Sequence, residues 1–226
     1  MSGKRFEVRK LTAVAMLCAL AFAVMVAGRF SLIPAAVFLK YDAKDVFIAV
    51  GGFLFGPLTS LLMSVTVSFM EMITVSESGI IGCVMNIIST VSFTCTAAFI
   101  YKKNKTIAGA AMGLISGIFL CTAVMLLWNY LLVPIYTPYI SREAVTGMLL
   151  PVFLPFNLLK GGLNAALTML LYKPVRVALD RSRLFPITEK DPAEKSSLKI
   201  NVGAFIISFF VVVSCVLVVL SMFHII

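Results

Sequence analysis

The segment Pro155–Asn164, PFNLLKGGLN, lies inside a long apolar run and places a lysine and two asparagines where lipid is expected. Asn157, Lys160 and Asn164 are spaced i, i+3 and i+7, so a helix carries all three on one face. A charged side chain at the centre of a membrane-spanning helix costs about 2.5–3.5 kcal/mol, and it usually faces a cavity or a partner. The segment therefore predicts a membrane helix whose polar face turns into a helical bundle.

The whole chain has the composition of a membrane protein. Of its 226 residues, 61% are hydrophobic and 13% are charged, whereas soluble domains carry about 25% charged residues. The second of its apolar segments is short for about 30 Å of hydrocarbon and holds Gly51 and Gly52, which predicts a tilted, broken or partly buried helix. We predict an all-α, polytopic membrane bundle of six helices plus a seventh, C-terminal transmembrane helix, with apolar segments at 11–28, 45–55, 58–75, 80–100, 107–133, 151–172 and 202–223.

The pattern divides the chain into three parts. Residues 1–178 hold the six-helix membrane domain, residues 179–200 form a polar, proline-containing cytoplasmic linker, and residues 201–226 add a C-terminal helix without a polar face. The basic residues before the first apolar segment also resemble the start of a signal peptide. That segment is long for a signal peptide and ends in a poor cleavage site, so we interpret it as a membrane span.

The net charge of +9 comes mainly from lysines and arginines in short loops. With a cytoplasmic N-terminus, the cytoplasmic segments 1–10, 56–57, 101–106 and 173–201 hold 14 of the 19 basic residues. This bias predicts a multi-pass membrane protein whose N-terminus is cytoplasmic. The sequence has no basic face with interleaved aromatic residues, so nucleic acid is not an expected partner.

Polar residues of other segments gather at a similar depth. Glu71, Asn86, Ser89 and Asn129 all fall in the outer half of their predicted spans. Together with the polar face of the sixth span, they predict a ligand cavity that opens outward. Two alternatives stay open: asparagines also join membrane helices to one another, and Glu71 would pair with Lys160 as a structural ion pair.

The segment FLKYDAKD, residues 38–45, lies outside between the first and second spans. It is typical of a loop that leads into a helix, with Asp42 or Asp45 as the N-cap. Beside a cavity that opens outward, it would equally serve as a lid.

Four alanines, Ala15, Ala19, Ala23 and Ala27, form a stripe of small residues in the first span, and such a stripe lets another helix approach closely. Packing inside the chain's own bundle and docking onto another subunit are equally compatible with this stripe.

Motifs for catalysis and for nucleotide hydrolysis are absent from the sequence. It contains no G-x-x-x-x-G-K-[ST] phosphate loop, no G-x-S-x-G and no H-E-x-x-H motif. The five cysteines lie singly in apolar segments, so we expect neither a metal site nor a cofactor, and no catalytic residue. These features favour a binding subunit without its own energy source; a stand-alone secondary carrier and a membrane-embedded enzyme are the alternatives.

Five segments together carry a resemblance to a known family: FLKYDAKD (38–45), FGPLTSLLMS (55–64), GCVMNIIST (82–90), LLWNYLLVPIYTPYI (126–140) and LPFNLLKGGLNAALTMLLYKP (154–174). They resemble the riboflavin-specific S component, the substrate-binding subunit, of energy-coupling factor (ECF) vitamin transporters over about residues 5–178. The resemblance implies a six-helix bundle that binds riboflavin from outside with high affinity. It also implies association with a transmembrane coupling subunit and two cytoplasmic ATPases, and a bundle that topples in the membrane to release the vitamin.

The resemblance also implies site residues. The coupling subunit would dock on Ala15, Ala19 and Ala23. Asparagine and lysine suit the polar edge of a flavin, because they offer several donors and an acceptor; another vitamin is the nearest alternative ligand. One departure is the seventh segment, since these S components normally end after six helices, and it would put the C-terminus outside. By motif, the implied riboflavin site consists of Leu39, Lys40, Tyr41, Asp42, Asn86, Ser89, Asn129, Asn157, Lys160 and Asn164.

Overall fold

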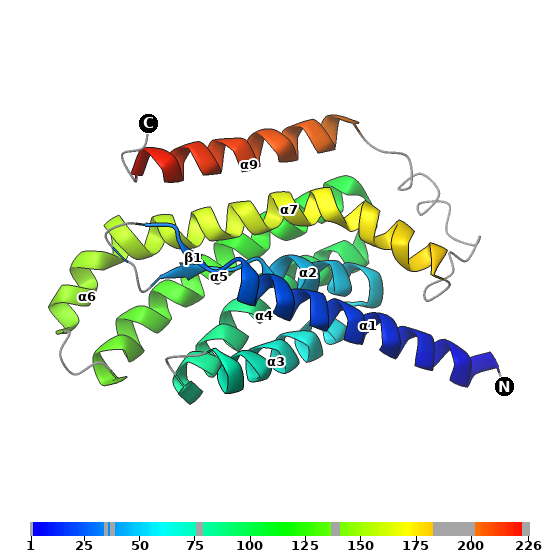
Figure 1. Cartoon of the computed structure of the whole chain (residues 1–226). Helices are drawn as coiled ribbons and strands as arrows, with labels where there is room; N and C mark the ends of the chain where they lie inside the picture. Colours follow the sequence, from blue (N-terminus) through cyan, green and yellow to red (C-terminus); the bar gives the residue numbers. More distant parts are fainter. Residues whose placement is uncertain are drawn as a thin grey trace.

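The computed structural model describes residues 2–33, 36, 39–75, 79–136, 141–182 and 202–222. These residues form a helical bundle, and a helix covers each of the seven predicted apolar segments (Figure 1). His224 and nearly all of the predicted linker lie outside the described residues. The long helices are α1 (Ser2–Ala27), α3 (Pro57–Thr74), α4 (Gly79–Lys103), α5 (Ile107–Tyr136), α7 (Leu154–Arg181) and α9 (Val202–Met222), and a shorter α2 covers Lys44–Phe55.

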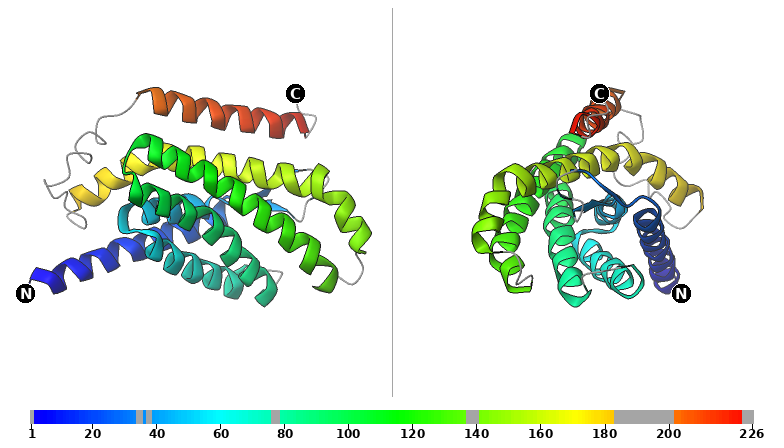
Figure 2. Two further views of the ribbon diagram at one scale, coloured as in Figure 1. Left: turned by 180° about the vertical axis from the view of Figure 1, so that it is seen from behind. Right: turned by 60° about the vertical axis from the view of Figure 1, so that its left-hand side comes forward.

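Six helical stretches of the described chain are long and apolar enough to cross a membrane, and α2 is not one of them. Instead α2 is the partly buried helix that the sequence allowed: it packs against α1, α3, α4 and α7, and most of its residues are buried (Figure 2). A Cβ added at Gly52 would lie 2.9 Å from the Cβ of Ala98, so the glycine permits the close approach of α4. Gly56 then turns the chain with φ +96°, and Pro57 begins α3 at a position that needs no N–H donor.

The chain between α5 and α7 contains structure that the sequence did not predict. A short helix, α6 (Arg142–Met148), begins after Ser141, whose side chain accepts a hydrogen bond from the N–H of Ala144. A π-helical stretch, η2 (Leu149–Phe153), joins α6 to α7. Pro155 in the first turn of α7 has no N–H to donate to the preceding turn, and this explains why the regular α-helical bonding is interrupted here.

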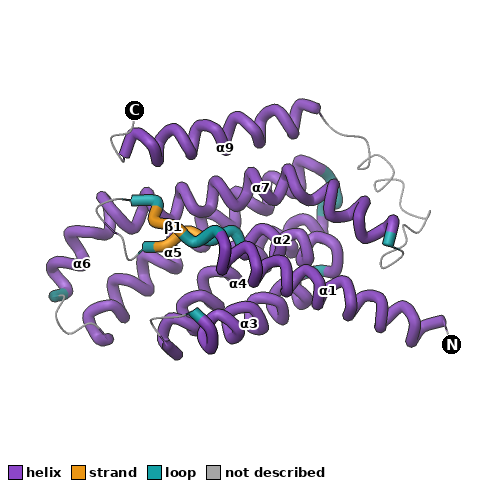
Figure 3. Tube along the Cα trace, viewed as in Figure 1, coloured by secondary structure: helices purple, strands orange, loops and turns teal. Residues whose placement is uncertain are grey.

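The loop between α1 and α2 contains a strand pairing that the sequence did not predict. Two short strands, β1 (Phe30–Ser31) and β2 (Lys40–Tyr41), pair in antiparallel register with Phe30 opposite Tyr41 (Figure 3). The rings of Phe30 and Tyr41 lie 5.2 Å apart between centroids. This pairing holds the two ends of the loop together close to the start of α2.

The C-terminal helix α9 lies along α7 (Figures 1 and 2). Only 6% of its most apolar 18-residue window is buried in the protein, so most of its surface is available to lipid. α7 extends to Arg181, beyond the predicted end of the sixth span at 172 and into the predicted linker.

Candidate functional site

The start of α2 and the polar face of α7 meet inside the bundle. The Lys160 Nζ lies 3.6 Å from the Asp42 Oδ2 and 3.9 Å from the Asp45 Oδ2, and the lysine side chain is 14% exposed. Asn157 and Asn164 on the same face of α7 are buried. The polar face of α7 therefore points into the protein, as the spacing of these residues predicted.

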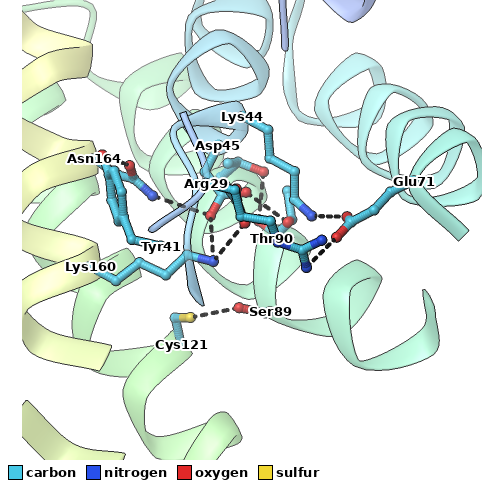
Figure 4. A network of polar contacts seen from close by, with 12 residues as sticks. Arg29, Tyr41, Lys44, Asp45, Glu71, Ser89, Thr90, Cys121, Lys160 and Asn164 are labelled. Carbon is cyan, nitrogen blue, oxygen red and sulfur yellow. Dashed lines mark hydrogen bonds and ion pairs between the residues drawn. The ribbon is translucent and has the colours of Figure 1, made fainter. Parts of the chain in front are cut away.

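A chain of hydrogen bonds ties this ion pair to two other elements, β2 and α4 (Figure 4). The Tyr41 hydroxyl donates to the Asn164 Oδ1 at 2.9 Å, and the Asn164 Nδ2 donates to the Asp45 Oδ2 at 3.3 Å. The Thr90 hydroxyl of α4 donates to the Asp45 Oδ1 at 2.7 Å. Asp45 thus receives two hydrogen bonds and lies 3.9 Å from a cation, interactions that offset part of the cost of burying a carboxylate.

This environment shifts the pKa values of two side chains in the α1–α2 loop, those of Asp42 and Tyr41. Burial opposes the ionisation of Asp42, but the positive charges of Lys160, Lys44 and Arg29 and a backbone hydrogen bond from Lys44 together outweigh it and hold the pKa of Asp42 below its ordinary value. Burial raises the pKa of Tyr41, so its hydroxyl keeps the proton that it donates to Asn164. One oxygen of Asp42, Oδ1, is buried and has no hydrogen-bond partner.

The N-cap prediction for this loop was wrong. Ala43 occupies the N-cap position of α2, and no side chain caps the helix. Asp45 instead lies within the first turn of α2 and turns its carboxylate toward Thr90 and Asn164. Tertiary partners in the bundle outweigh the local bond that an N-cap aspartate would make.

A second charge cluster lies beside the first. Glu71 of α3 forms ion pairs with Lys44 of α2 and, at 3.1 Å, with Arg29 of the α1–α2 loop. The side chains of Glu71 and Lys44 are each 1% exposed, whereas that of Arg29 is 28% exposed. Glu71 therefore pairs with cations of the first loop and of α2, and the alternative pairing with Lys160 is not formed.

Four of the ten predicted site residues, Tyr41, Asp42, Lys160 and Asn164, belong to the network of the first cluster. Sequence reasoning did not assign Asp45 and Thr90 to the site, although both adjoin predicted residues. Lys44, which belongs to the second cluster, was not assigned to the site either. The signal for Lys44 and Asp45 was available, because two charges open a short helix that is otherwise apolar.

The other predicted residues have local surroundings of their own. The Asn129 and Asn157 amides each donate to the carbonyl four residues earlier, at 2.7 and 2.8 Å, which uses one of their two N–H groups. The Ser89 hydroxyl lies 3.5 Å from the Cys121 Sγ. Lys40 pairs with Ser31 in the hairpin. Leu39 and Asn86 are half-buried.

The alanine stripe of α1 faces away from the bundle: Ala15, Ala19, Ala23 and Ala27 are all exposed. Packing within the described part of this chain, one of the two alternatives for the stripe, is therefore not what the structure shows. Within the same described residues, no group of three or more histidines, cysteines, aspartates and glutamates is arranged to hold a metal ion.

These features define the chain as a membrane-embedded helical bundle with a buried, charged polar site between its helices. Residues 9–172 match the family described as the ECF transporter, substrate-specific component, and the chain belongs to that family. This finding confirms the predicted fold class. The members of this family are the substrate-specific components of transporters rather than enzymes.

The curated relatives are similar along nearly their whole length. The chain is 29% identical to the riboflavin transporter FmnP of Bacillus subtilis over 185 residues, which cover 78% of this chain and 97% of that protein. It is 30% identical to the riboflavin transporter RibU of Streptococcus thermophilus, covering 76% and 84%, and 26% identical to RibU of Staphylococcus aureus, covering 80% and 100%. A solved S component of a bacterial ECF transporter superposes with a TM-score of 0.64 at 26% identity, over 77% of this chain and 99% of that one.

Proposed function

We propose that this chain is the high-affinity riboflavin-binding subunit of an ECF-type importer. The three curated relatives named above are riboflavin transporters, and the chain covers most of each. The observation that carries the proposal is the pairing of Lys160 with Asp42, whose buried Oδ1 lacks a partner. A buried acceptor without a partner costs about 1–3 kcal/mol, and a ligand N–H would remove that cost.

The chemistry of the two side chains suits the polar edge of a flavin. That edge alternates carbonyl oxygens with an N–H. The Lys160 ammonium offers donors for a carbonyl, and the Asp42 carboxylate accepts from the N–H. Asn164 hydrogen-bonds to Asp45 and to Tyr41, which are close to Asp42 in the sequence. These bonds help to hold Lys160 and Asp42 in position.

The proposed site extends from this pair to the residues on α4, α5 and the outer end of α7. Asn129 and Asn157 each have a second N–H and an amide oxygen with which to contact a ligand. The remaining members of the proposed site are Leu39, Lys40, Asn86 and Ser89.

The proposed transport cycle requires other subunits. The sequence has no phosphate-binding loop, so we assign ATP hydrolysis to two cytoplasmic ATPase subunits and docking to a transmembrane coupling subunit. The exposed alanines Ala15, Ala19 and Ala23 are the proposed docking surface, because small side chains let a partner helix approach closely. The excess of basic residues in alternate loops supports a cytoplasmic N-terminus in the bacterial plasma membrane.

Riboflavin binding by the purified chain tests the proposal. Purified in detergent, the wild-type protein should carry a flavin absorption spectrum or quench the fluorescence of added riboflavin at one site per chain. Lys160→Ala should weaken binding by about 10- to 150-fold, because it removes a hydrogen bond from a charged donor worth about 1.5–3 kcal/mol. Lys173→Ala is the matched control on the same helix. A wild-type chain that binds no riboflavin, or equal affinities for both variants and wild type, would overturn the assignment.

A further inference from the structure

The helix α9 lies outside residues 9–172, which match the family. About four-fifths of this chain covers nearly the full length of the Bacillus and Staphylococcus relatives. The contacts that α9 makes within this chain indicate its role.

One face of α9 packs on an apolar cluster to which two elements of the proposed site contribute. Its side chains contact a buried apolar cluster that contains residues of the α1–α2 loop, namely Leu32, Ile33, Ala36 and Tyr41, and residues of α7, namely Phe156 and Leu163. The contacts come from Val212, Cys215, Val219 and Met222, which are spaced i, i+3, i+7 and i+10 and so form one stripe. The loop and α7 thus contribute to one apolar cluster, and α9 packs against it.

The direction of α9 places this stripe beside the end of the protein that holds the proposed site (Figure 1). Its C-terminal end lies near β1, beside the end of α7 that follows α6 (Figure 1). A Cβ added at Gly162 of α7 would lie 3.7 Å from the Cys215 Sγ, so the two helices are in direct contact two residues along α7 from Lys160. The neighbouring positions Val211 and Val218 are 39% and 46% exposed, so they lie on the lipid-exposed side of the helix next to this stripe.

We propose that Val212, Cys215 and Val219 of α9 are positioning residues, which hold the α1–α2 loop against α7 and thereby keep Tyr41 in its hydrogen bond to Asn164. The inference rests on the proposed riboflavin site. A ligand that leaves past this loop requires the loop to separate from α7, and that movement would expose Leu32 and Ile33, which are now 0% and 2% exposed. α9 therefore slows the release of bound vitamin.

Two double variants of the full chain test this role. Val212→Ala with Val219→Ala removes four methyl groups from the packing face, and Val211→Ala with Val218→Ala removes the same number from the lipid face. The first measurement is backbone hydrogen exchange in β1 and β2 of the ligand-free protein. Exchange should be faster in the packing-face variant than in the lipid-face variant, because the hairpin opens more often.

The second measurement is the riboflavin dissociation rate, followed by the recovery of flavin fluorescence after displacement. The packing-face variant should release riboflavin about three- to tenfold faster, with the association rate little changed. In a Tyr41→Phe background this difference should shrink, because α9 acts through Tyr41; a merely structural role would leave the ratio unchanged.

The two measurements distinguish a failure of the proposed riboflavin-binding function from a failure of the proposed role of α9. A wild-type chain that binds no riboflavin overturns the proposed function, while the hydrogen-exchange comparison still decides whether α9 holds the loop. Equal exchange in both variants, or equal dissociation rates from a chain that does bind riboflavin, overturns the positioning role of α9.

Discussion

The carboxylate of Glu71 lies between two cations, and Glu71→Gln removes its charge while preserving its size. The Lys44 ammonium is then left 1% exposed beside an amide. Removing one partner of a buried ion pair costs about 3–5 kcal/mol, because the remaining charge has neither water nor a counter-ion. Arg29 contributes less to this cost, since its side chain is 28% exposed and water can solvate it.

The expected loss of about 3–5 kcal/mol is a large fraction of the roughly 5–15 kcal/mol that stabilises a typical domain. Equilibrium unfolding in mixed detergent micelles measures this loss directly. Glu143→Gln is the matched control, because Glu143 is exposed on α6, and it should change the free energy of unfolding by less than about 0.5 kcal/mol.

A double variant distinguishes a lost ion pair from a simple loss of packing. Lys44→Met combined with Glu71→Leu removes both buried charges and keeps apolar volume, so it should be much more stable than Glu71→Gln alone. The reasoning is refuted if Glu71→Gln unfolds with a free energy within about 0.5 kcal/mol of wild type. It is also refuted if the double variant is as unstable as the single one.

Three further changes address the site, the docking surface and α9. Tyr41→Phe removes the donor to the Asn164 Oδ1 and should weaken riboflavin binding by about tenfold, measured by fluorescence quenching; unchanged affinity would show that this bond does not organise the site. Ala19→Leu should preserve binding by the purified chain but block uptake by cells that also express the coupling subunit and ATPases, and normal uptake would exclude the alanine stripe as the docking surface. Gly162→Cys should form a disulfide with Cys215 under mild oxidation, seen as a loss of free thiols, because the added Cβ would lie 3.7 Å from the Cys215 Sγ. Gly161→Cys, which faces Ile118, should not, and equal thiol loss in both would place α9 elsewhere.

The positions of the helices were predictable because the underlying signals are local. Long apolar runs identify membrane helices by their length and composition. The glycines of 45–55 and the shortness of that run indicated a tilted, broken or partly buried helix, and α2 is largely buried in the bundle. The stripe of Asn157, Lys160 and Asn164 indicated which face of α7 turns inward, because helical periodicity relates residues only a few positions apart.

The pairing of charges was decided by the tertiary structure. Glu71 and Lys160 lie in different helices at similar predicted depths, so their sequence positions left a pair between them open. The rotation of α3 turns Glu71 toward Lys44, while the loop before α2 brings Asp42, and the first turn of α2 brings Asp45, to Lys160. Helix rotation depends on how side chains pack across interfaces, and no pattern within one helix specifies it. For the same reason, the apolar sequence of α9 predicted a membrane helix, whereas only packing placed it against α7 and the α1–α2 loop.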